Sequence, residues 1–456
     1  MNFTYSYKKH IVSILSLSFL LYSMPFNAQT LSLDSCKTLA VRNNAKVQNA
    51  ALDIDIARQT KNEALTKYFP NLKLSGIGYH ALNPLLEVGI DDVPNANVRA
   101  LLNTFYAEYG ATLGLPNQLS FFRNGYAANI TATQPIFAGG RIVNGNKLAA
   151  LGIEAAEAQH DIAVQEMLQQ TEESYWLVIS LQEKRRTLQQ AQLLVDTLAH
   201  DLSGAIAAGL ATQNERLKLS LKQNELKSQR LTLDNGIALA KMALCQAIGI
   251  AYTDTLMLTD TLSEATVAPF DVYRPTNDAV AQRTETRLLE LGVKSEQLQR
   301  KMTLGETLPQ IALVANYGYG HLWDYSGGMN GMLLATIQIP LTDWWATGHK
   351  LTAHNKKVQI AENNRRHLTE QMQLQTQKAW NELLEAYAQI DLADETCDNA
   401  RQNLDIATQN YQAGLAPLSE LLEAQTLLQQ ATDQRNDARI DYQMALTRYR
   451  QLTGQK

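Results

Sequence analysis

The stretch YQAGLAPLSE, residues 411–420, interrupts a long polar sequence that otherwise has the character of a continuous helix. Gly414 is typical of the residue that ends a helix, and Pro417 suits the first turn of a new helix, where no backbone N–H is needed. A near copy, AAGLATQNE at residues 207–215, occurs 205 positions earlier, with Gly209 in the place of Gly414. We therefore interpret both stretches as the tips of helical hairpins.

Heptad patterns flank both tips and predict helices that supercoil against their neighbours. A dimeric coiled coil would favour larger residues, whereas many of these positions are alanine. In the first half of the chain the pattern includes Leu177, Leu181, Lys184, Leu188, Ala191, Val195, Leu198, Leu202 and Ala205. In the second half it includes Ala379, Leu383, Ala386, Ile390, Ala393, Cys397, Ala400, Leu404, Ala407 and Tyr411, and then Leu421, Ala424, Leu428, Ala431, Arg435, Ala438, Tyr442, Ala445, Tyr449 and Leu452.

The spacing of the prolines predicts that these helices are long. No proline occurs between Pro135 and Pro269 or between Pro340 and Pro417, and an interior proline would cost a helix about 3 kcal/mol. A helix from about residue 144 to residue 208 would measure roughly 95 Å at 1.5 Å per residue. We expect the tips to lie far from the segments in which the prolines cluster.

Four segments near the prolines alternate between apolar and polar residues and predict β-strands of about ten residues, the length of a tilted membrane strand. They are NLKLSGIGYHAL (71–82), YAANITATQPIF (126–137), QIALVANYGYGH (310–321) and MLLATIQIPL (332–341). The first alternates less cleanly, and we expect it to slip register near Ser75. Strands of a soluble sandwich also alternate, so the aromatic residues at the segment ends matter. These are Tyr68, Phe69, Tyr79, Phe121, Phe122, Phe137, Trp323, Tyr325, Trp344 and Trp345, which is typical of the aromatic girdle of a membrane barrel.

The chain is internally duplicated. Pro135, Gly209 and Gly249 match Pro340, Gly414 and Gly454 at one offset of 205 residues, whereas Pro70 matches Pro309 at 239. The first repeat therefore has a longer connection between its strands. We expect a first repeat over residues 29–250 and a second over 277–456, each with the order helix, strand, strand, long helical hairpin. Residues 251–276 link them.

The N-terminus has the layout of a secretory signal peptide over residues 1–28. Lys8 and Lys9 precede an apolar run from Ile11 to Leu21 that is too short to span a bilayer, and Ala28 is a small residue at a possible cleavage position. The alternative is a buried N-terminal helix. The three cysteines, Cys36, Cys245 and Cys397, have no disulfide or metal-ligand spacing, and we interpret them as buried thiols.

Composition and motifs argue against other function classes. The chain is 45% hydrophobic and 19% charged with a net charge of −5, which does not suit a nucleic-acid partner. His349 and His354 lack a metal-ligand spacing, and no nucleotide-binding or nucleophile motif appears. We expect no enzyme activity, no cofactor and no metal site.

Because four strands cannot close a barrel in lipid, the chain must oligomerise in order to insert.

The sequence resembles the TolC-like outer-membrane efflux family over nearly the whole mature chain. The resemblance rests on LSLDSCKTLAVRNNAKVQNA (31–50), on TQPIFAGGRIVNGNKLAA (133–150) and on the two tips. The second of these is similar to the family's strand-to-helix motif, with Phe137, Gly139, Gly140 and Arg141 in place. Its counterpart, PLTDWWATGHK (340–350), has three more residues before the glycine, which puts the helix register there in doubt.

The resemblance implies a mainly α-helical protein with a membrane β-barrel portion. Each chain of a homotrimer would contribute four transmembrane strands to the outer membrane and long hairpins to a periplasmic α-helical barrel. Such proteins are exit ducts for drugs, metals or polypeptides in tripartite efflux or type I secretion, and they dock with a periplasmic adaptor and an inner-membrane pump. A soluble periplasmic coiled-coil or adaptor protein is the alternative.

Two sites follow from this comparison. We expect the tips to dock the adaptor, because apolar groups at a helix reversal are not needed for a core. The tip residues are Gly209, Leu210, Thr212, Gly414, Leu415, Pro417 and Leu418. LDIATQNYQAG (404–414) resembles the stretch in which the family has a constricting aspartate, which makes Asp405 the candidate periplasmic gate. Asp405 follows the seam residue Leu404 and points about 100° away from it, and three copies would form a carboxylate ring that attracts cations.

The longer connection between the first two strands, residues 83–125, is expected to face the cell exterior. Within it, Val98, Leu101, Leu102, Phe105 and Tyr109 suit a short amphipathic helix, and disorder is the alternative.

Overall fold

The computed structural model describes residues 30–83, 86–116, 118–121, 124–207, 209, 211–262, 267–321 and 327–455. The expected signal peptide lies outside these ranges, as do Leu210 of the first tip and Phe122, Trp323 and Tyr325 of the expected girdle. The chain divides into two compact units. The first consists of Met1–Leu52, Ala158–Arg287 and Leu368–Lys456, and the second of Asp53–Glu157 and Leu288–His367. Each sequence repeat therefore supplies segments to both units.

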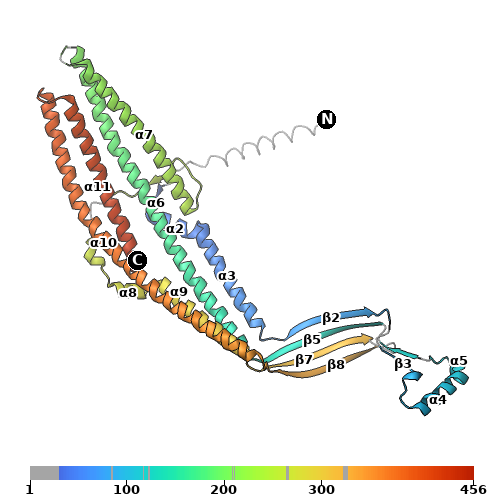
Figure 1. Cartoon of the computed structure of the whole chain (residues 1–456). Helices are drawn as coiled ribbons and strands as arrows, with labels where there is room; N and C mark the ends of the chain where they lie inside the picture. Colours follow the sequence, from blue (N-terminus) through green and yellow to red (C-terminus); the bar gives the residue numbers. More distant parts are fainter. Residues whose placement is uncertain are drawn as a thin grey trace, which may run out of the picture. The chain divides into compact units, whose positions relative to one another are not determined.

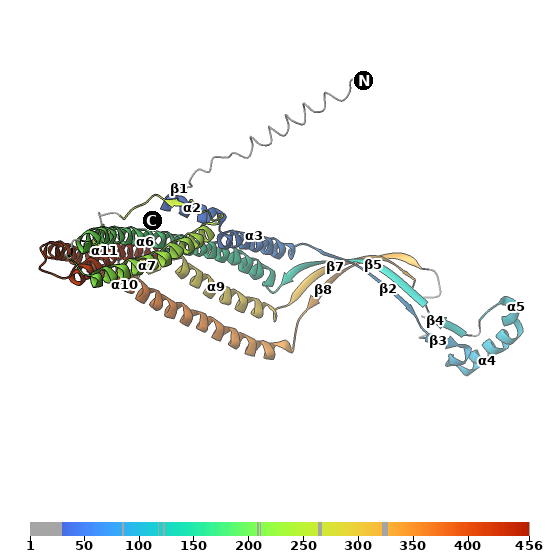
Figure 2. The same ribbon diagram turned by 90° about the horizontal axis from the view of Figure 1, so that it is seen from above.

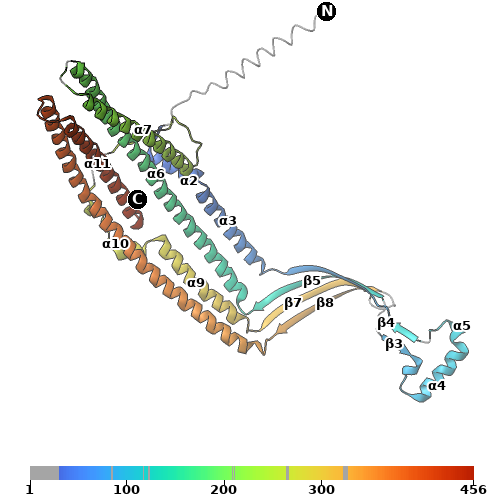
Figure 3. The same cartoon turned by 45° about the horizontal axis from the view of Figure 1, so that its top comes forward.

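Two helical hairpins dominate the first unit. Helix α6 (Arg141–Ala207) is followed by α7 (Gln213–Ile248), and α10 (Asp343–Gln412) is followed by α11 (Leu418–Leu452). Figures 1 and 3 show α7 running along α6 and α11 running along α10. Helices α6 and α10 contain 67 and 70 residues, so the long helices predicted from the proline spacing are confirmed.

The start of α10 resolves the doubt about its register. At the offset of 205 residues, the end of α10 at Gln412 matches the end of α6 at Ala207, but α10 starts at Asp343, three residues earlier than the position that matches Arg141. Because Pro340 also keeps the offset of 205, no residue is inserted, and α10 instead begins three residues closer to the preceding strand. The offset of 205 holds at the tip.

The remaining elements of the first unit close its core. The parallel bridge of β1 (Thr30–Leu31) to β6 (Met257–Leu258) holds the chain ahead of α2 (Leu33–Asn43). A 3₁₀ turn, η3 (Pro269–Val272), and α8 (Thr276–Ala281) complete the link between the repeats. The three cysteines are free and buried, as predicted. The core residues include Leu31, Cys36, Tyr175, Leu244 and Ile248 in one cluster and Trp380, Leu383, Tyr442, Leu446 and Tyr449 in another.

The second unit contains an antiparallel sheet of four strands in the order β2-β5-β7-β8 (Figure 2). The strands are β2 (Asn71–His80), β5 (Asn124–Ala138), β7 (Gln310–His321) and β8 (Gly328–Gln338), which confirms the four predicted segments as strands. Helices α3 (Ala45–Thr66) and α9 (Thr284–Gly305) precede β2 and β7. Both helices begin in the first unit and continue in the second.

The predicted register slip near Ser75 is wrong. Strand β2 pairs with β5 without interruption, from Asn71 opposite Thr133 to His80 opposite Asn124. The irregularity instead lies between β5 and β7, where the register shifts between Pro135 and Phe137. Pro135 has no N–H to donate, so an extra residue in the ladder is accommodated there as a bulge.

The connection between β2 and β5 is ordered into several short elements where it is described. Strands β3 (Leu86–Gly89) and β4 (Gln118–Phe121) form a hairpin that the sequence reasoning missed. Between them lie η1 (Ile90–Asp92), α4 (Ala96–Phe105), the π-helical turn η2 (Tyr106–Gly110) and α5 (Ala111–Leu113). Asn95 caps α4, because its side chain accepts hydrogen bonds from the N–H groups of Asn97 and Val98. The predicted amphipathic helix is confirmed.

Candidate functional site

The first helical tip is a tightly bonded turn. Gly209 adopts φ +74° and its N–H donates to the carbonyl oxygen of Ile206 over 3.0 Å, which ends α6. Thr212 then caps α7. The N–H of Glu215 donates to the Thr212 hydroxyl over 3.3 Å, and the Thr212 N–H donates to the Glu215 carboxylate over 2.9 Å. This reciprocal capping box satisfies donors that would otherwise lack partners at the start of the helix.

The second tip repeats the first turn but not its cap. Gly414 has φ +72° and donates to Tyr411 O over 3.0 Å, at the positions that match Gly209 and Ile206, while the Leu415 N–H reaches Asn410 O over 2.8 Å. Pro417 stands where Thr212 stands in the first copy and makes no side-chain cap. The duplication has therefore kept the glycine turn and replaced a hydrogen-bonded cap by a fixed proline φ.

Exposure separates the predicted docking residues into two groups. Gly209, Thr212, Gly414 and Pro417 are exposed, and the Leu415 side chain is 80% exposed. Leu418 is different, with only 1% exposure. The prediction that no apolar group at the tips serves a core is wrong for Leu418, which belongs to a buried cluster of both hairpins. This cluster contains Leu188, Ala191, Val195, Leu202, Leu219, Leu226 and Leu418.

Asp405 lies on the exposed side of α10. Its neighbour Leu404 packs against a buried cluster formed by Ala407, Leu421 and Ala424, so the carboxylate does point away from the seam that α10 shares with α11. Within the described residues no group of three or more His, Cys, Asp or Glu side chains is arranged to hold a metal ion. Asp405 is therefore not part of such a group in a single chain.

The strand-to-helix motif forms a turn of two glycines with left-handed backbone. Gly139 and Gly140 have φ +62° and +75°, and α6 begins at the next residue. Gly139 lies so close to the last residue of α9, Gly305, that a Cβ on either glycine would clash with the other's backbone. In the second repeat the corresponding junction is helical instead of a glycine turn. Trp344 lies inside α10, and its indole N–H donates to Thr307 O over 3.3 Å.

One face of the sheet carries a row of hydrogen-bonded polar side chains that the sequence reasoning did not identify as a unit. Ser75 donates to Asn129 over 3.0 Å, and Asn129 donates to Thr131 over 3.3 Å. Thr131 in turn donates to Asn316. The row crosses β2, β5 and β7. The alternation of Asn129 and Thr131 was visible in the sequence, but the partners on β2 and β7 required the register.

The opposite face of the sheet is apolar and exposed. Ile130 lies opposite Leu74 of β2 and Tyr317 of β7 in the ladder, which places all three on this face. The exposed side chains there include Leu72, Leu74, Ile130, Tyr317, Leu333 and Ile337, each more than half exposed. Strands β2 and β8 each pair on one side only among the described residues, so the sheet has two open edges. No described helix is long and apolar enough to span a bilayer.

Comparisons with known proteins give one matching family model and several solved structures of similar fold. Residues 276–455 match the family model described as outer membrane efflux protein. The Campylobacter jejuni CmeC outer membrane channel superposes with a TM-score of 0.75 at 15% identity, covering 92% of this chain and 85% of that one. The outer membrane protein VceC of Vibrio cholerae gives 0.70 at 16% identity, covering 93% and 96%. No curated protein sequence matches the chain.

The open state of the Neisseria gonorrhoeae MtrE outer membrane channel gives a TM-score of 0.72 at 15% identity, covering 93% of this chain and 89% of that one. At these identities the solved structures establish the shared fold. The family model that matches residues 276–455 describes outer membrane efflux proteins. The predicted resemblance is confirmed over residues 276–455 by the family model, and the fold agrees with it over nearly the whole chain.

Proposed function

We propose that the chain is an outer-membrane efflux protein and serves as the exit duct of a tripartite efflux or type I secretion system, because residues 276–455 match that family model and the fold is shared with outer membrane channels. The observation that carries the proposal is the sheet of the second unit. It has one face with a row of polar side chains, one exposed apolar face and, among the described residues, two open edges. Such a sheet is unstable alone in water or in lipid.

A barrel closed by the sheets of three chains is the arrangement that fits this function best. Three copies joined from β8 to β2 would give a barrel of about twelve strands, which lies within the range of membrane barrels. Joining edge to edge pairs the backbone groups that each single chain leaves open. The homotrimer is therefore part of the proposal, and so are the four transmembrane strands per chain.

The two faces of the sheet define how it would sit in the membrane. The apolar face with Leu72, Leu74 and Ile337 suits contact with lipid tails. The polar row with Ser75, Asn129 and Asn316 would line a water-filled lumen, where its side chains meet water and solutes. Lys73 lies opposite Thr131 in the ladder, so the same face also carries a positive charge beside its hydroxyl and amide groups.

The tips are the proposed docking surface for a periplasmic adaptor, which connects the duct to an inner-membrane pump. Their exposed residues are held by backbone turns rather than by packing. The side chain of Leu415 is available to a partner, being 80% exposed. Leu418 is excluded from this surface, because its burial serves the cluster that joins the hairpins.

Native mass spectrometry of detergent-extracted protein tests the duct proposal. The expected species is a stable trimer in the membrane fraction. A stable monomer, or recovery from the soluble periplasm without detergent, would refute the proposal and favour a periplasmic coiled-coil protein.

Docking has a separate test. We expect Leu415→Asp to abolish export of a transported dye while trimers remain in the membrane. Leu374→Asp on α10, where the leucine is 72% exposed, is the matched control and should leave export unchanged. Equal export by wild-type and Leu415→Asp would remove the docking assignment while leaving the duct itself intact.

A further inference from the structure

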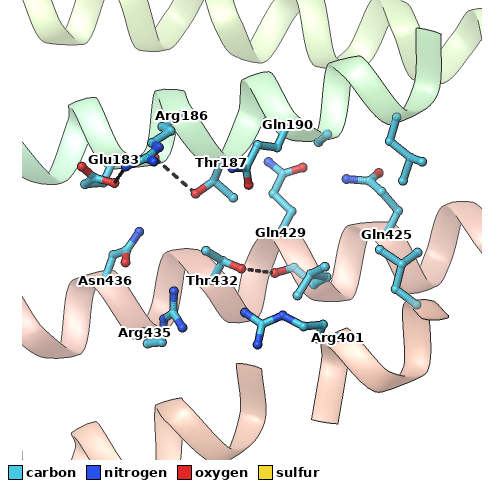
Figure 4. A pocket seen from close by; sticks show the side chains of 14 residues that line it. Glu183, Arg186, Thr187, Gln190, Arg401, Gln425, Gln429, Thr432, Arg435 and Asn436 are labelled. Atoms are coloured by element: carbon cyan, nitrogen blue, oxygen red, sulfur yellow. Dashed lines mark hydrogen bonds and ion pairs between the residues drawn. The ribbon is translucent and has the colours of Figure 1, made fainter. Parts of the chain in front are cut away.

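A polar cavity of about 430 Å³ lies in the first unit, between α6 of one hairpin and α10 and α11 of the other (Figure 4). Its lining is unusual for a helix seam, because three arginines and one glutamate face it together with several amides. The side chains that matter here are Glu183, Arg186, Arg401, Gln425, Arg435 and Asn436. A cavity of this size falls within the range of small-molecule sites.

The three arginines differ in their partners. Arg186 lies 3.9 Å from the carboxylate of Glu183, and Arg401 pairs with Asp398 over 3.0 Å. Within the described part of the chain, Arg435 has no such carboxylate, and its Nε atom is buried without a hydrogen-bond partner. Arg435 also occupies a position of the heptad seam that is otherwise alanine, leucine or tyrosine. Arg435 as a whole is only partly buried, but a guanidinium nitrogen that has lost water without gaining a partner favours pairing with an anion.

A second, independent observation points into the same cavity. Gln425 is 3% exposed, and its side-chain oxygen is buried without a partner among the described residues. Asn436, next to Arg435, is 8% exposed and also lines the cavity. Buried polar atoms without partners are rare in folded proteins, because each forfeits a hydrogen bond that it would have in water. The cavity therefore presents buried polar groups that a polar ligand can satisfy.

From this arrangement we propose that the cavity binds a small oxyanion, a carboxylate or a phosphate, with its charged oxygens on Arg435. Guanidinium groups bind both oxyanions through paired, charge-assisted hydrogen bonds. Glu183 and Asp398 offset the charges of Arg186 and Arg401, which leaves Arg435 as the uncompensated positive charge of the lining. Gln425 lies ten residues before Arg435 on α11, about 15 Å away along the helix axis, so its amide meets water at the other end of the cavity rather than the oxyanion itself.

Binding there would couple the two hairpins. Arg186 belongs to α6, whereas Arg401 and Arg435 belong to α10 and α11, so an anion among them bridges helices of both repeats. A ligand that binds only the folded arrangement stabilises it, and the stabilisation grows with the logarithm of the ligand concentration once that exceeds Kd. The site does not depend on the proposed duct function, and either can fail without the other.

Calorimetric titration of the full-length, detergent-solubilised protein tests the site. The probes are inorganic phosphate and citrate, in separate arms, with sodium chloride of equal ionic strength as the reference. We expect saturable binding of at least one probe, and the arm that binds identifies the oxyanion class. In Arg435→Gln the affinity should fall about tenfold or more, because the charge-assisted bonds are lost, and Arg435→Lys should restore part of it.

Arg216→Gln is the matched control, since Arg216 is exposed on α7 and does not line the cavity. Its affinity should equal that of the wild-type protein. If Arg435→Gln fails to fold, Arg401→Gln serves instead, because half of that side chain is in solvent, and it should weaken binding severalfold. No saturable binding in the wild-type protein would overturn the proposal, as would equal affinities in all variants or a response that follows ionic strength alone.

Discussion

The backbone of Gly139 lies against the backbone of Gly305, so that a Cβ added to Gly139 would stand 2.0 Å from the carbonyl oxygen of Gly305. A Cβ on Gly305 would in turn stand 2.3 Å from the carbonyl oxygen of Gly139. The contact joins the turn that follows β5 to the end of α9, and thereby one repeat to the other within the second unit. Neither glycine has room for a side chain.

Alanine at either glycine should destabilise the second unit. Gly139→Ala combines the clash with a left-handed φ of +62° that alanine adopts poorly. Gly305 has no such φ, so Gly305→Ala measures the clash alone, and we expect it to cost about 1–3 kcal/mol. The melting temperature of the detergent-solubilised protein measures both effects.

Gly152→Ala is the control for these substitutions. Gly152 lies within α6, and among the described residues nothing beyond its own helix backbone comes within 4 Å of the place that an alanine Cβ would take. Alanine there should be neutral or stabilise the helix by up to about 1 kcal/mol. If Gly305→Ala has the same melting temperature as Gly152→Ala and the wild-type protein, the close approach of Gly139 and Gly305 does not constrain the fold.

Loss of the capping box at the first tip should loosen the start of α7. Thr212→Ala removes the hydroxyl that accepts the Glu215 N–H, at a cost of about 1 kcal/mol. Hydrogen exchange of the amides in residues 213–217 should become faster. Ser419→Ala in the first turn of α11 is the control, because Pro417 caps that helix without a side-chain bond. Unchanged exchange in Thr212→Ala would mean that the turn is held by Gly209 alone.

Asp433 gives the contact between α6 and α11 a pH dependence. Burial, together with the negative charge of Asp437, raises the pKa of Asp433 to about 6, although Lys184 and a hydrogen bond from Thr187 act in the opposite direction. In the unfolded chain the group titrates near its ordinary value of 3.8. The folded state therefore binds the proton more tightly. Stability should fall as pH rises from about 4 to about 6 and stay level above that.

Asp433→Asn should remove this penalty. At pH 7.5 we expect the variant to be more stable than the wild-type protein, by about 1 kcal/mol after allowance for solvent screening, and the difference should vanish near pH 4. Melting curves across this range measure it. Asp161→Asn, at a carboxylate that is 61% exposed, is the control and should follow the wild-type profile. A constant difference between Asp433→Asn and wild type at all pH values would contradict the assignment.

Periodicity predicted the elements of this fold well, because long proline-free heptads and alternating strands are local signals. The glycine turns at both tips were also local. What the sequence did not disclose depends on contacts between distant segments. Leu418 has the local setting of an exposed tip residue, and only the packing of the other hairpin buries it. Gly305 was overlooked for the same reason, since its constraint comes from Gly139.

Asp405 remains a predicted gate, and measurements of single-channel conductance test this role. The carboxylate is exposed on α10 and points away from the seam occupied by Leu404. In the proposed trimer, three copies around the axis would form a ring that concentrates divalent cations and slows their passage. We expect Asp405→Ala to raise single-channel conductance in planar bilayers and to relieve block by cobalt or magnesium.

Asp398→Ala is the matched control for the gate. Asp398 lies about two helical turns before Asp405 on the same helix, and its carboxylate is already paired with Arg401 over 3.0 Å. A carboxylate neutralised by its own arginine should contribute little to a field along the axis, so Asp398→Ala should leave conductance and cation block unchanged. If Asp405→Ala has the same conductance as the wild-type protein and is blocked by cations to the same extent, Asp405 is a surface charge and the constriction is formed elsewhere along the hairpins.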